Sequence, residues 1–421
     1  MVAEGLHKQP LEAISKRIAE MKFNCVRLTW ALFMVTNSTL GSVTFRQSLQ
    51  NHGLVDTIKG VEVNNPALVD LPVIQVFQEV VSKLGDNNVM VILDNHLSKP
   101  GWCCSNNDGN GFFGDQYFDP QLWTSGLAKM ASMFSSSTNV VAMSLRNEPR
   151  GPRQNTGDWY RYMKEGAESV HSANPNVLVI ISGLSYASDL SFLSQKQLDL
   201  TFKGKLVYEL HSYSWYRGSP DEACSKYVQD VMRGGGFLLD QGWPLFISEF
   251  GADERGTNAN DNNFLNCFLG LAAERDLDWA LWTLQGSYYL RQGVIGMEEF
   301  YGVLDSSWGQ LRNASILQRL SAIQPATQEG LDRQPLDAIS KRIAEMKFNC
   351  VRLTRVLFMV TDSTLGSVRF RQPLQNHGLV DTIKGVEVNN PGLVDLPEVV
   401  SKLGDDNVMV ILDNHLSKPG W

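Results

Sequence analysis

The chain contains 421 residues, of which 43% are hydrophobic and 19% are charged, a composition typical of a globular protein with a sizeable core. Its formal net charge is −8, from 37 Lys and Arg against 45 Asp and Glu, without a basic run, which argues against a nucleic acid partner. No stretch approaches the roughly 20 apolar residues of a membrane-spanning helix, so no membrane partner is expected either.

Short β-branched runs alternate with amphipathic helical stretches along the chain, which is typical of βα units around a parallel sheet. A first helix is expected over residues 10–21 and a later one over residues 158–173. Seven strands are expected before residue 285, over residues 24–29, 89–96, 140–148, 177–183, 205–213, 244–251 and 278–284. The pattern predicts a (β/α)₈ TIM barrel in which only seven of the eight strands are recognised.

Each expected strand is apolar through its middle, and six of them end in polar or aromatic side chains. In chain order these ends supply Arg27, then Asp94 to His96, Asn147 with Glu148, His211 with Tyr213, Glu249 and Trp282. In a (β/α)₈ barrel the carboxyl ends of all strands meet on one face, where catalysis takes place. A single polar residue at a strand end is explained by a turn, but a recurrence along six strands favours one shared cleft.

Two glutamates, Glu148 and Glu249, stand at the ends of separate strands. Glycoside hydrolysis needs such a pair, with one protonated carboxyl group to donate to the leaving oxygen and one ionised carboxylate opposite it. Arg27 and Tyr213 are suited to keep Glu249 charged, which leaves Glu148 as acid and base. The pair would also be consistent with two structural ion pairs, so the pairing alone leaves both interpretations open.

At this point the sequence resembles glycoside hydrolase family five, of the plant cellulase-like kind. The resemblance extends from residue 4 to about residue 325 and lies in six short motifs in the family's order: VRLT at 26–29, ILDNH at 92–96, RNEP at 146–149, HSY at 211–213, SEFG at 248–251 and LWTL at 281–284. It implies a barrel that hydrolyses β-linked glucans or mannans with retention, without a metal or organic cofactor. It also implies an extracellular protein, although the first residues lack the apolar core of a signal peptide.

The resemblance assigns a role to each motif residue. Glu148 would be the acid/base and Glu249 the nucleophile, and Asn147 would bind the sugar 2-hydroxyl. His211 and Tyr213 would support the glutamates. Arg27 and His96 would complete the polar floor of the cleft, and Trp282 would stack against the sugar at the cleaved bond. The family has a first strand and a secretion signal before the position at which this chain starts.

An internal duplication divides the chain. The segment that begins at Glu4 returns at Glu329, and the copy lacks VIQVFQ (residues 73–78) and ends at Trp421, the equivalent of Trp102. Residues 1–325 are therefore expected to form the catalytic domain, and residues 326–421 a non-catalytic partial duplicate of residues 4–102. One hypothesis inserts the copied strand, residues 349–355, into the vacant first position of the barrel, and the alternative makes the copy a loosely docked appendage.

Two weaker signals concern possible ligands. The six cysteines show no zinc spacing, and NNDGNGFFGDQY (residues 106–117) departs from a calcium loop because its last position is Tyr117. The interpretation adopted is a Gly- and Asn-rich cleft loop that carries Phe112, Phe113 and Tyr117 near the sugar.

Three functions from different classes therefore compete. The first is a retaining β-glycosidase acting on a polysaccharide or oligosaccharide, and the second is a carbohydrate-binding pseudoenzyme inactivated by loss of the first strand. The third is a barrel lyase or isomerase, for which metal ligands or a phosphate-binding glycine loop would be expected, and neither is visible in the sequence. The oligomeric state is left open.

Overall fold

The structure is a computed structural model that describes residues 3–216, 223–323, 350–356 and 409–416. The chain divides into two compact units, Met1–Ile323 and Gln324–Trp421. The boundary lies close to the one that the duplication predicts, while the assignment of catalysis to the first segment alone stays a prediction.

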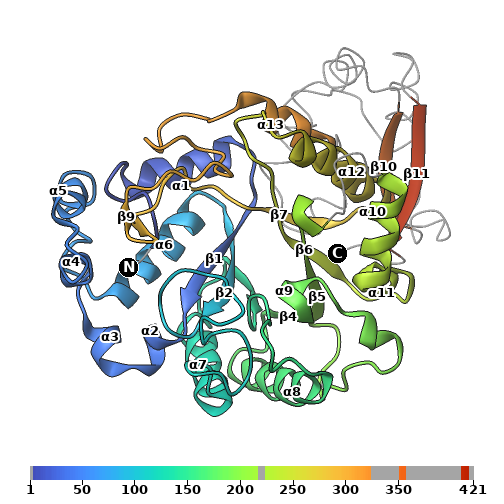
Figure 1. The fold of residues 1–421 in the computed structure, drawn as a ribbon, viewed down its shortest axis with the longest axis horizontal. Coiled ribbons are helices and arrows are strands. Elements are labelled where there is room, and N and C mark those ends of the chain that lie inside the picture. Colours follow the sequence, from blue (N-terminus) through green and yellow to red (C-terminus); the bar gives the residue numbers. More distant parts are fainter. Residues whose placement is uncertain (1–2, 217–222, 324–349, 357–408, 417–421) are drawn as a thin grey trace, which may run out of the picture. The chain divides into compact units, whose positions relative to one another are not determined.

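The first unit is built around a curled sheet of seven parallel strands in chain order, with helices outside it, which is the TIM-barrel fold (Figure 1). Each strand pairs in parallel with the next, from β1 to β7. The strands are β1 (Cys25–Ala31), β2 (Met90–Leu97), β3 (Val140–Ser144), β4 (Leu178–Ser182), β5 (Leu206–Ser212), β6 (Leu245–Phe250) and β7 (Asp278–Leu281). All seven expected strands are present.

The two outer strands of this sheet, β1 and β7, approach each other without pairing in the described part of the chain. Phe23, just before β1, packs edge-on against Trp279 of β7, with ring centroids 6.3 Å apart. The sheet thus curls round until its first and last strands come near each other. A contact between side chains is found at the place where paired strands would close the barrel.

Five expected strands end earlier than the sequence suggested, and beyond three of them, β3, β5 and β7, predicted site residues lie in the following turn. β3 stops at Ser144, and Glu148 has φ of 46°, a left-handed conformation that a strand does not accommodate. Tyr213 and Trp282 likewise follow the last residues of β5 and β7. The site is therefore divided between strand residues, such as Glu249 of β6, and the turns that follow the strands.

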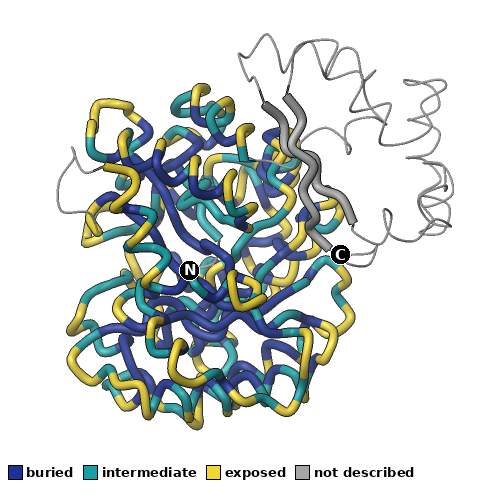
Figure 2. The backbone as a smooth tube through the Cα atoms, turned by 90° about the vertical axis from the view of Figure 1, so that its right-hand side faces the viewer, coloured by how far each residue is buried: buried dark blue, intermediate teal, exposed yellow. Residues whose placement is uncertain are grey.

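The helices surround the sheet, and Figure 2 shows the buried residues concentrated on the inside. The expected helices are confirmed as α1 (Leu11–Glu20) and α8 (Thr156–Ala173). α8 begins where the Asn155 side chain accepts a hydrogen bond from the Asp158 amide, as an N-cap does. None of the described helices is long and apolar enough to cross a membrane.

The other helical segments of the first unit complete this layer. They are α2 (Phe33–Thr36), α3 (Ser38–Ser42), α4 (Phe45–Gln50), α5 (Val55–Asn64), α6 (Val73–Asp86), α7 (Pro120–Met133), α9 (Leu184–Ala187), α10 (Cys224–Val231), α11 (Phe237–Asp240), α12 (Ala259–Arg275) and α13 (Ala314–Leu320), with short turns η1 (Ser191–Ser194), η2 (Ser214–Tyr216), η3 (Met232–Gly236) and η4 (Ser321–Ile323). A small antiparallel pair, β8 (Leu290–Arg291) and β9 (Val294–Ile295), follows β7.

The described part of the second unit is a parallel pair, β10 (Cys350–Val356) and β11 (Met409–Leu416), which forms a sheet of its own. Cys350 lies opposite Met409, the same register that Cys25 and Met90 have in β1 and β2. The insertion of the copied strand into the barrel is therefore wrong, because β10 is paired with the partner strand that was duplicated along with it. The copied helices lie outside the described residues.

This separate pairing leads to a prediction about truncation. A chain that ends after Gln324 is expected to melt at the same temperature as the full chain, because no strand of the barrel sheet is removed. Thermal unfolding followed by circular dichroism measures this. A drop of several degrees, which corresponds to about 1 kcal/mol or more for a domain of this size, would show that the copy stabilises the barrel.

Candidate active site

The two glutamates expected to act as a pair lie next to each other. Glu249 belongs to β6, whereas Glu148 lies in the turn after β3, and both are buried. A carboxylate oxygen of each and a ring nitrogen of His211 all lie within 4.8 Å of one another. The curled sheet thus brings together groups that are far apart in the sequence.

Glu249 is held by two hydrogen-bond donors. Arg27 Nη1 donates to Oε1 at 2.8 Å, and the Tyr213 hydroxyl donates to Oε2 at 2.9 Å. Arg27 Nη2 also donates to Asn147 Oδ1 at 2.9 Å, so the same guanidinium holds Glu249 and orients the amide. Hydrogen bonds from a guanidinium and a hydroxyl group stabilise the charged form of a carboxylate.

Glu148 has a different environment. Burial raises the pKa of Glu148 to about 7, although the charges of His96, Arg150 and Arg27 act in the opposite direction. His211 Nδ1 lies 2.9 Å from Glu148 Oε1, and burial lowers the pKa of His211, which favours the neutral imidazole. Two adjacent carboxyl groups with unlike surroundings can divide the roles of acid and base between them.

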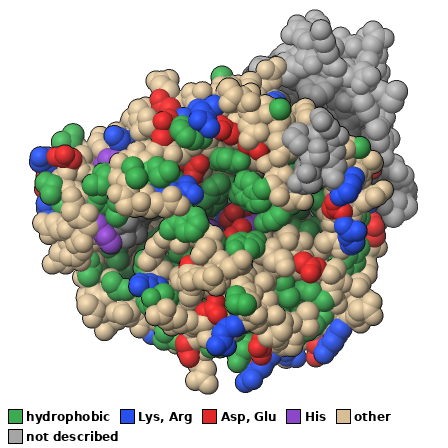
Figure 3. All heavy atoms as spheres, viewed as in Figure 1, with side chains coloured by type: hydrophobic (Ala, Val, Ile, Leu, Met, Phe, Trp, Pro, Cys, Tyr) green, Lys and Arg blue, Asp and Glu red, His purple; other side chains and the backbone are tan. Residues whose placement is uncertain are grey.

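The rings of His96 and Trp282 are stacked. They are parallel within 9°, with centroids 5.8 Å apart. His96 Nδ1 lies 2.7 Å from Asp94 Oδ2, so the buried carboxylate fixes the orientation of the imidazole. Figure 3 shows acidic side chains in a hollow of this face, surrounded by hydrophobic ones. All eight sequence-predicted residues are therefore gathered around one site.

A third glutamate of the site, Glu209, was not expected from the sequence. It lies within β5, is fully buried, and accepts a hydrogen bond from Ser144 Oγ at 2.6 Å. Its Oε2 is 3.9 Å from Arg27 Nη2, and burial raises the pKa of Glu209 above its usual value. The available signal was its position two residues before His211, on the same face of the strand. This residue also corrects the expectation that every strand is apolar through its middle.

Arg150, also missed, anchors the turn that carries Glu148. Its Nη1 donates to the Glu148 backbone carbonyl at 2.8 Å, and its Nη2 donates to Asp108 at 2.6 Å. The loop of residues 106–117 is thereby tied to the turn that carries Glu148. The expectation that its aromatic residues face the sugar is wrong for Phe112 and Phe113, which are 0% and 4% exposed and pack in the core.

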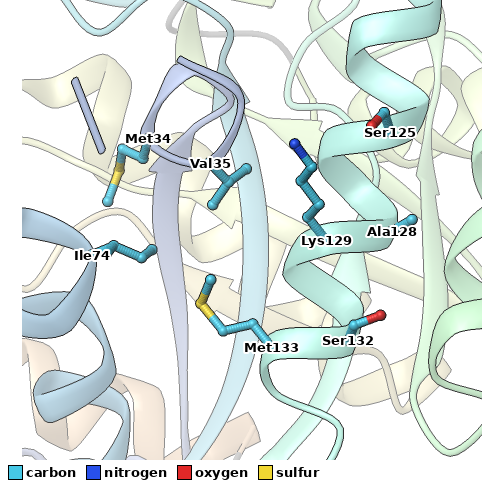
Figure 4. Close-up of a pocket in the computed structure, with 8 residues that line it drawn as sticks. All are labelled: Met34, Val35, Ile74, Ser125, Ala128, Lys129, Ser132 and Met133. Atoms are coloured by element: carbon cyan, nitrogen blue, oxygen red, sulfur yellow. The ribbon is translucent and has the colours of Figure 1, made fainter. Parts of the chain in front are cut away.

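A separate pocket lies outside the barrel (Figure 4). It is lined by Met34 and Val35 of α2, Ile74 of α6 and, from α7, Ser125, Ala128, Lys129, Ser132 and Met133. None of these residues belongs to a strand end, and the pocket contains none of the predicted site residues.

Comparisons with known proteins bear on the family. The model of the cellulase family, described as Cellulase (glycosyl hydrolase family 5), matches residues 4–287. A glycosyl hydrolase 5 family protein of Chamaecyparis obtusa is 46% identical over 337 residues, which is 77% of this chain and 61% of that protein. An endoglucanase of Paenibacillus polymyxa is 21% identical over 66% of this chain and 70% of that protein.

Solved structures support the fold. A hyperthermostable endocellulase is 19% identical and has a TM-score of 0.63, covering 76% of this chain and 88% of its own. The catalytic domain of the major endoglucanase of Xanthomonas campestris is 18% identical with a TM-score of 0.62, covering 77% and 91%. At such identities the likeness concerns the barrel alone. The family model, by contrast, matches most of the chain, and on that ground the chain belongs to glycosyl hydrolase family 5, the cellulase family.

Proposed function

We propose that the chain is a retaining glycoside hydrolase that cleaves β-1,4-linked glucan, with Glu148 as acid/base and Glu249 as nucleophile. The observation that carries this proposal is the approach of the two carboxyl groups, which have oxygens within 4.8 Å of each other. Retaining enzymes place their carboxyl groups about 5 to 5.5 Å apart, whereas inverting enzymes keep about 6.5 to 9.5 Å to admit a water molecule.

The reaction proceeds in two steps on these residues. In the first, Glu249 attacks the anomeric carbon while Glu148 transfers its proton to the leaving oxygen, so that one carbon–oxygen bond forms and another breaks. In the second, Glu148, now ionised, takes a proton from water, which attacks the same carbon and releases Glu249. The proton held by Glu148 at the start is thus restored.

The surrounding residues are proposed to support these steps. Arg27 and Tyr213 hold Glu249 in its attacking position, and His211 accompanies Glu148. Asn147, oriented by Arg27, is placed to bind the sugar 2-hydroxyl. The parallel rings of His96 and Trp282 offer a surface for stacking the sugar at the cleaved bond.

The choice of glucan follows the relatives. Several are endoglucanases, and an endocellulase of Pyrococcus horikoshii has been solved with cellotetraose. The pseudoenzyme alternative is not favoured, because both glutamates and their hydrogen-bond partners are in place. The chain spans 61% of the length of its Chamaecyparis relative. The glucan substrate is therefore proposed for this chain and is not taken over from that relative.

The test is hydrolysis by the purified chain. Reducing-sugar release is measured on β-1,4-glucan and, in parallel, on β-1,4-mannan, and proton NMR records the first anomer formed. The β-anomer from glucan is expected. Initial release of the α-anomer would contradict retention, cleavage of mannan alone would contradict the glucan assignment, and no release from either would favour the binding protein.

The pH dependence is expected to report the acid. Because the pKa of Glu148 is raised to about 7, its proton is present below that pH and is lost as the pH rises. kcat/KM should therefore fall above pH 7, by about tenfold per pH unit. The control is Glu148→Ala with an activated aryl glycoside, for which this decline should disappear. A profile that stays flat to pH 9 in the unsubstituted enzyme would contradict the assignment.

The cysteines bear on the compartment, and we propose that the chain is extracellular. Cys224 and Cys267 form a disulfide between α10 and α12, and such bonds persist in oxidising environments. If both thiols in protein isolated from its natural source reacted with alkylating agents before reduction, the proposal would be wrong.

A further inference from the structure

A pair of adjacent cysteines lies beside the proposed sugar-binding residues. The sulfurs of Cys103 and Cys104, which are joined as a disulfide, lie within 4.8 Å of a ring nitrogen of His96 and of each other. The Asn147 side-chain nitrogen is 3.7 Å from one sulfur and 3.8 Å from the other. All three members of the cluster are partly exposed, so small solutes can reach them.

We propose that reduction of this disulfide creates a binding site for a thiophilic divalent cation, such as Cd²⁺ or Zn²⁺, on two thiolates and His96, and that occupancy blocks the cleft. The metal-binding part stands on the cluster alone. The inhibitory part rests on the proposed function, because it requires His96 and Asn147 to contact the sugar.

The chemistry of the three groups suits such an ion. Two thiolates, one imidazole and a water molecule make a tetrahedral set that Zn²⁺ and its heavier relatives accept. His96 Nδ1 is hydrogen-bonded to Asp94 Oδ2 at 2.7 Å, so Nε2 is the nitrogen left to coordinate. A carboxylate behind a ligating histidine is the usual arrangement, since it fixes the ring and makes it more basic.

A small dithiol can supply the electrons for the reduction. Two electrons and two protons pass from the dithiol to the disulfide, which yields two cysteine thiols and the oxidised, cyclic form of the reagent. Binding of the cation then releases the two thiol protons. The oxidised pair lacks thiolates, so the site exists only after reduction.

A second cluster in the described residues predicts a different response. Glu148, His211 and Glu249 also offer three ligand atoms within 4.8 Å of one another, two carboxylate oxygens and one imidazole nitrogen. A cation bound there would inhibit the oxidised enzyme as well and would show no sulfur-to-metal absorption. The two sites are therefore distinguishable by reduction and by spectrum.

The experiment uses the full chain before and after treatment with a dithiol, which is removed by anaerobic desalting. Cd²⁺ is titrated while thiolate-to-cadmium absorption near the ultraviolet edge and hydrolysis are both recorded. The reduced enzyme is expected to gain the absorption and to lose at least tenfold in activity, competitively with substrate, whereas the oxidised enzyme changes in neither. Cys104→Ser should weaken the binding of Cd²⁺ by about 100-fold or more.

The matched control is Cys25→Ala, which removes a free cysteine of β1 outside the cluster and should leave the cadmium response intact. Each variant is compared with its own metal-free activity. Equal inhibition of the oxidised enzyme, or an unchanged absorption in reduced Cys104→Ser, would overturn the site. Absorption without inhibition would overturn only the blocking of the cleft, and an enzyme inactive before cadmium would instead contradict the proposed function.

Discussion

Replacing Glu249 by Gly is expected to abolish hydrolysis of every glycoside, lowering kcat by about 10⁴-fold or more. The reason is that no glycosyl-enzyme forms without the nucleophilic carboxylate, however good the leaving group. The substitution also removes the acceptor of the Arg27 and Tyr213 hydrogen bonds, so circular dichroism must first show that the variant is folded.

Azide tests the cause of this loss. In Glu249→Gly the anion has room to attack the anomeric carbon directly, so an activated β-glycoside should yield the α-glycosyl azide. The control is Glu165→Gln, which removes an exposed carboxylate of α8 that forms an ion pair with Arg161. Full activity of Glu249→Gly on an aryl glycoside without azide would contradict the nucleophile assignment.

Replacing Glu148 by Ala is expected to divide substrates into two groups. Hydrolysis of glucan, whose leaving oxygen must be protonated, should fall by about 10² to 10⁴-fold, the usual contribution of general acid catalysis. An aryl glycoside with a good leaving group should still form the glycosyl-enzyme, which then accumulates because no base activates water. Measurement of the initial burst of released phenol detects this intermediate.

The product with azide again identifies the role. In Glu148→Ala azide attacks the glycosyl-enzyme and should give the β-glycosyl azide, the opposite anomer to that from Glu249→Gly. The raised pKa of Glu148 and its contact with His211 agree with a proton donor. If both variants produced the same anomer, or lost the aryl substrate equally, the proposed division of roles would be wrong.

The sequence by itself determined the architecture and the identity of the paired glutamates. Strands alternating with amphipathic helices predict a parallel barrel, and in a parallel barrel every strand's carboxyl end lies on one face. Glu148 and Glu249 could therefore be placed in one cleft from chain order alone. The repeated segment likewise predicted the copied strand over residues 349–355, which is present as β10.

Only the tertiary structure decided how these residues meet. The distance between Glu148 and Glu249 depends on the curl of the sheet and on the turn after β3, where φ is positive. The roles of Glu209 and Arg150 could not be predicted, because their partners, Arg27 and Asp108, are remote in the chain. The same holds for three other features, namely the burial of Phe112 and Phe113, the partner of β10, and the approach of Cys103 and Cys104 to His96. Periodicity reports which face a residue occupies, but contacts between distant residues arise only when the sheet curls and packs.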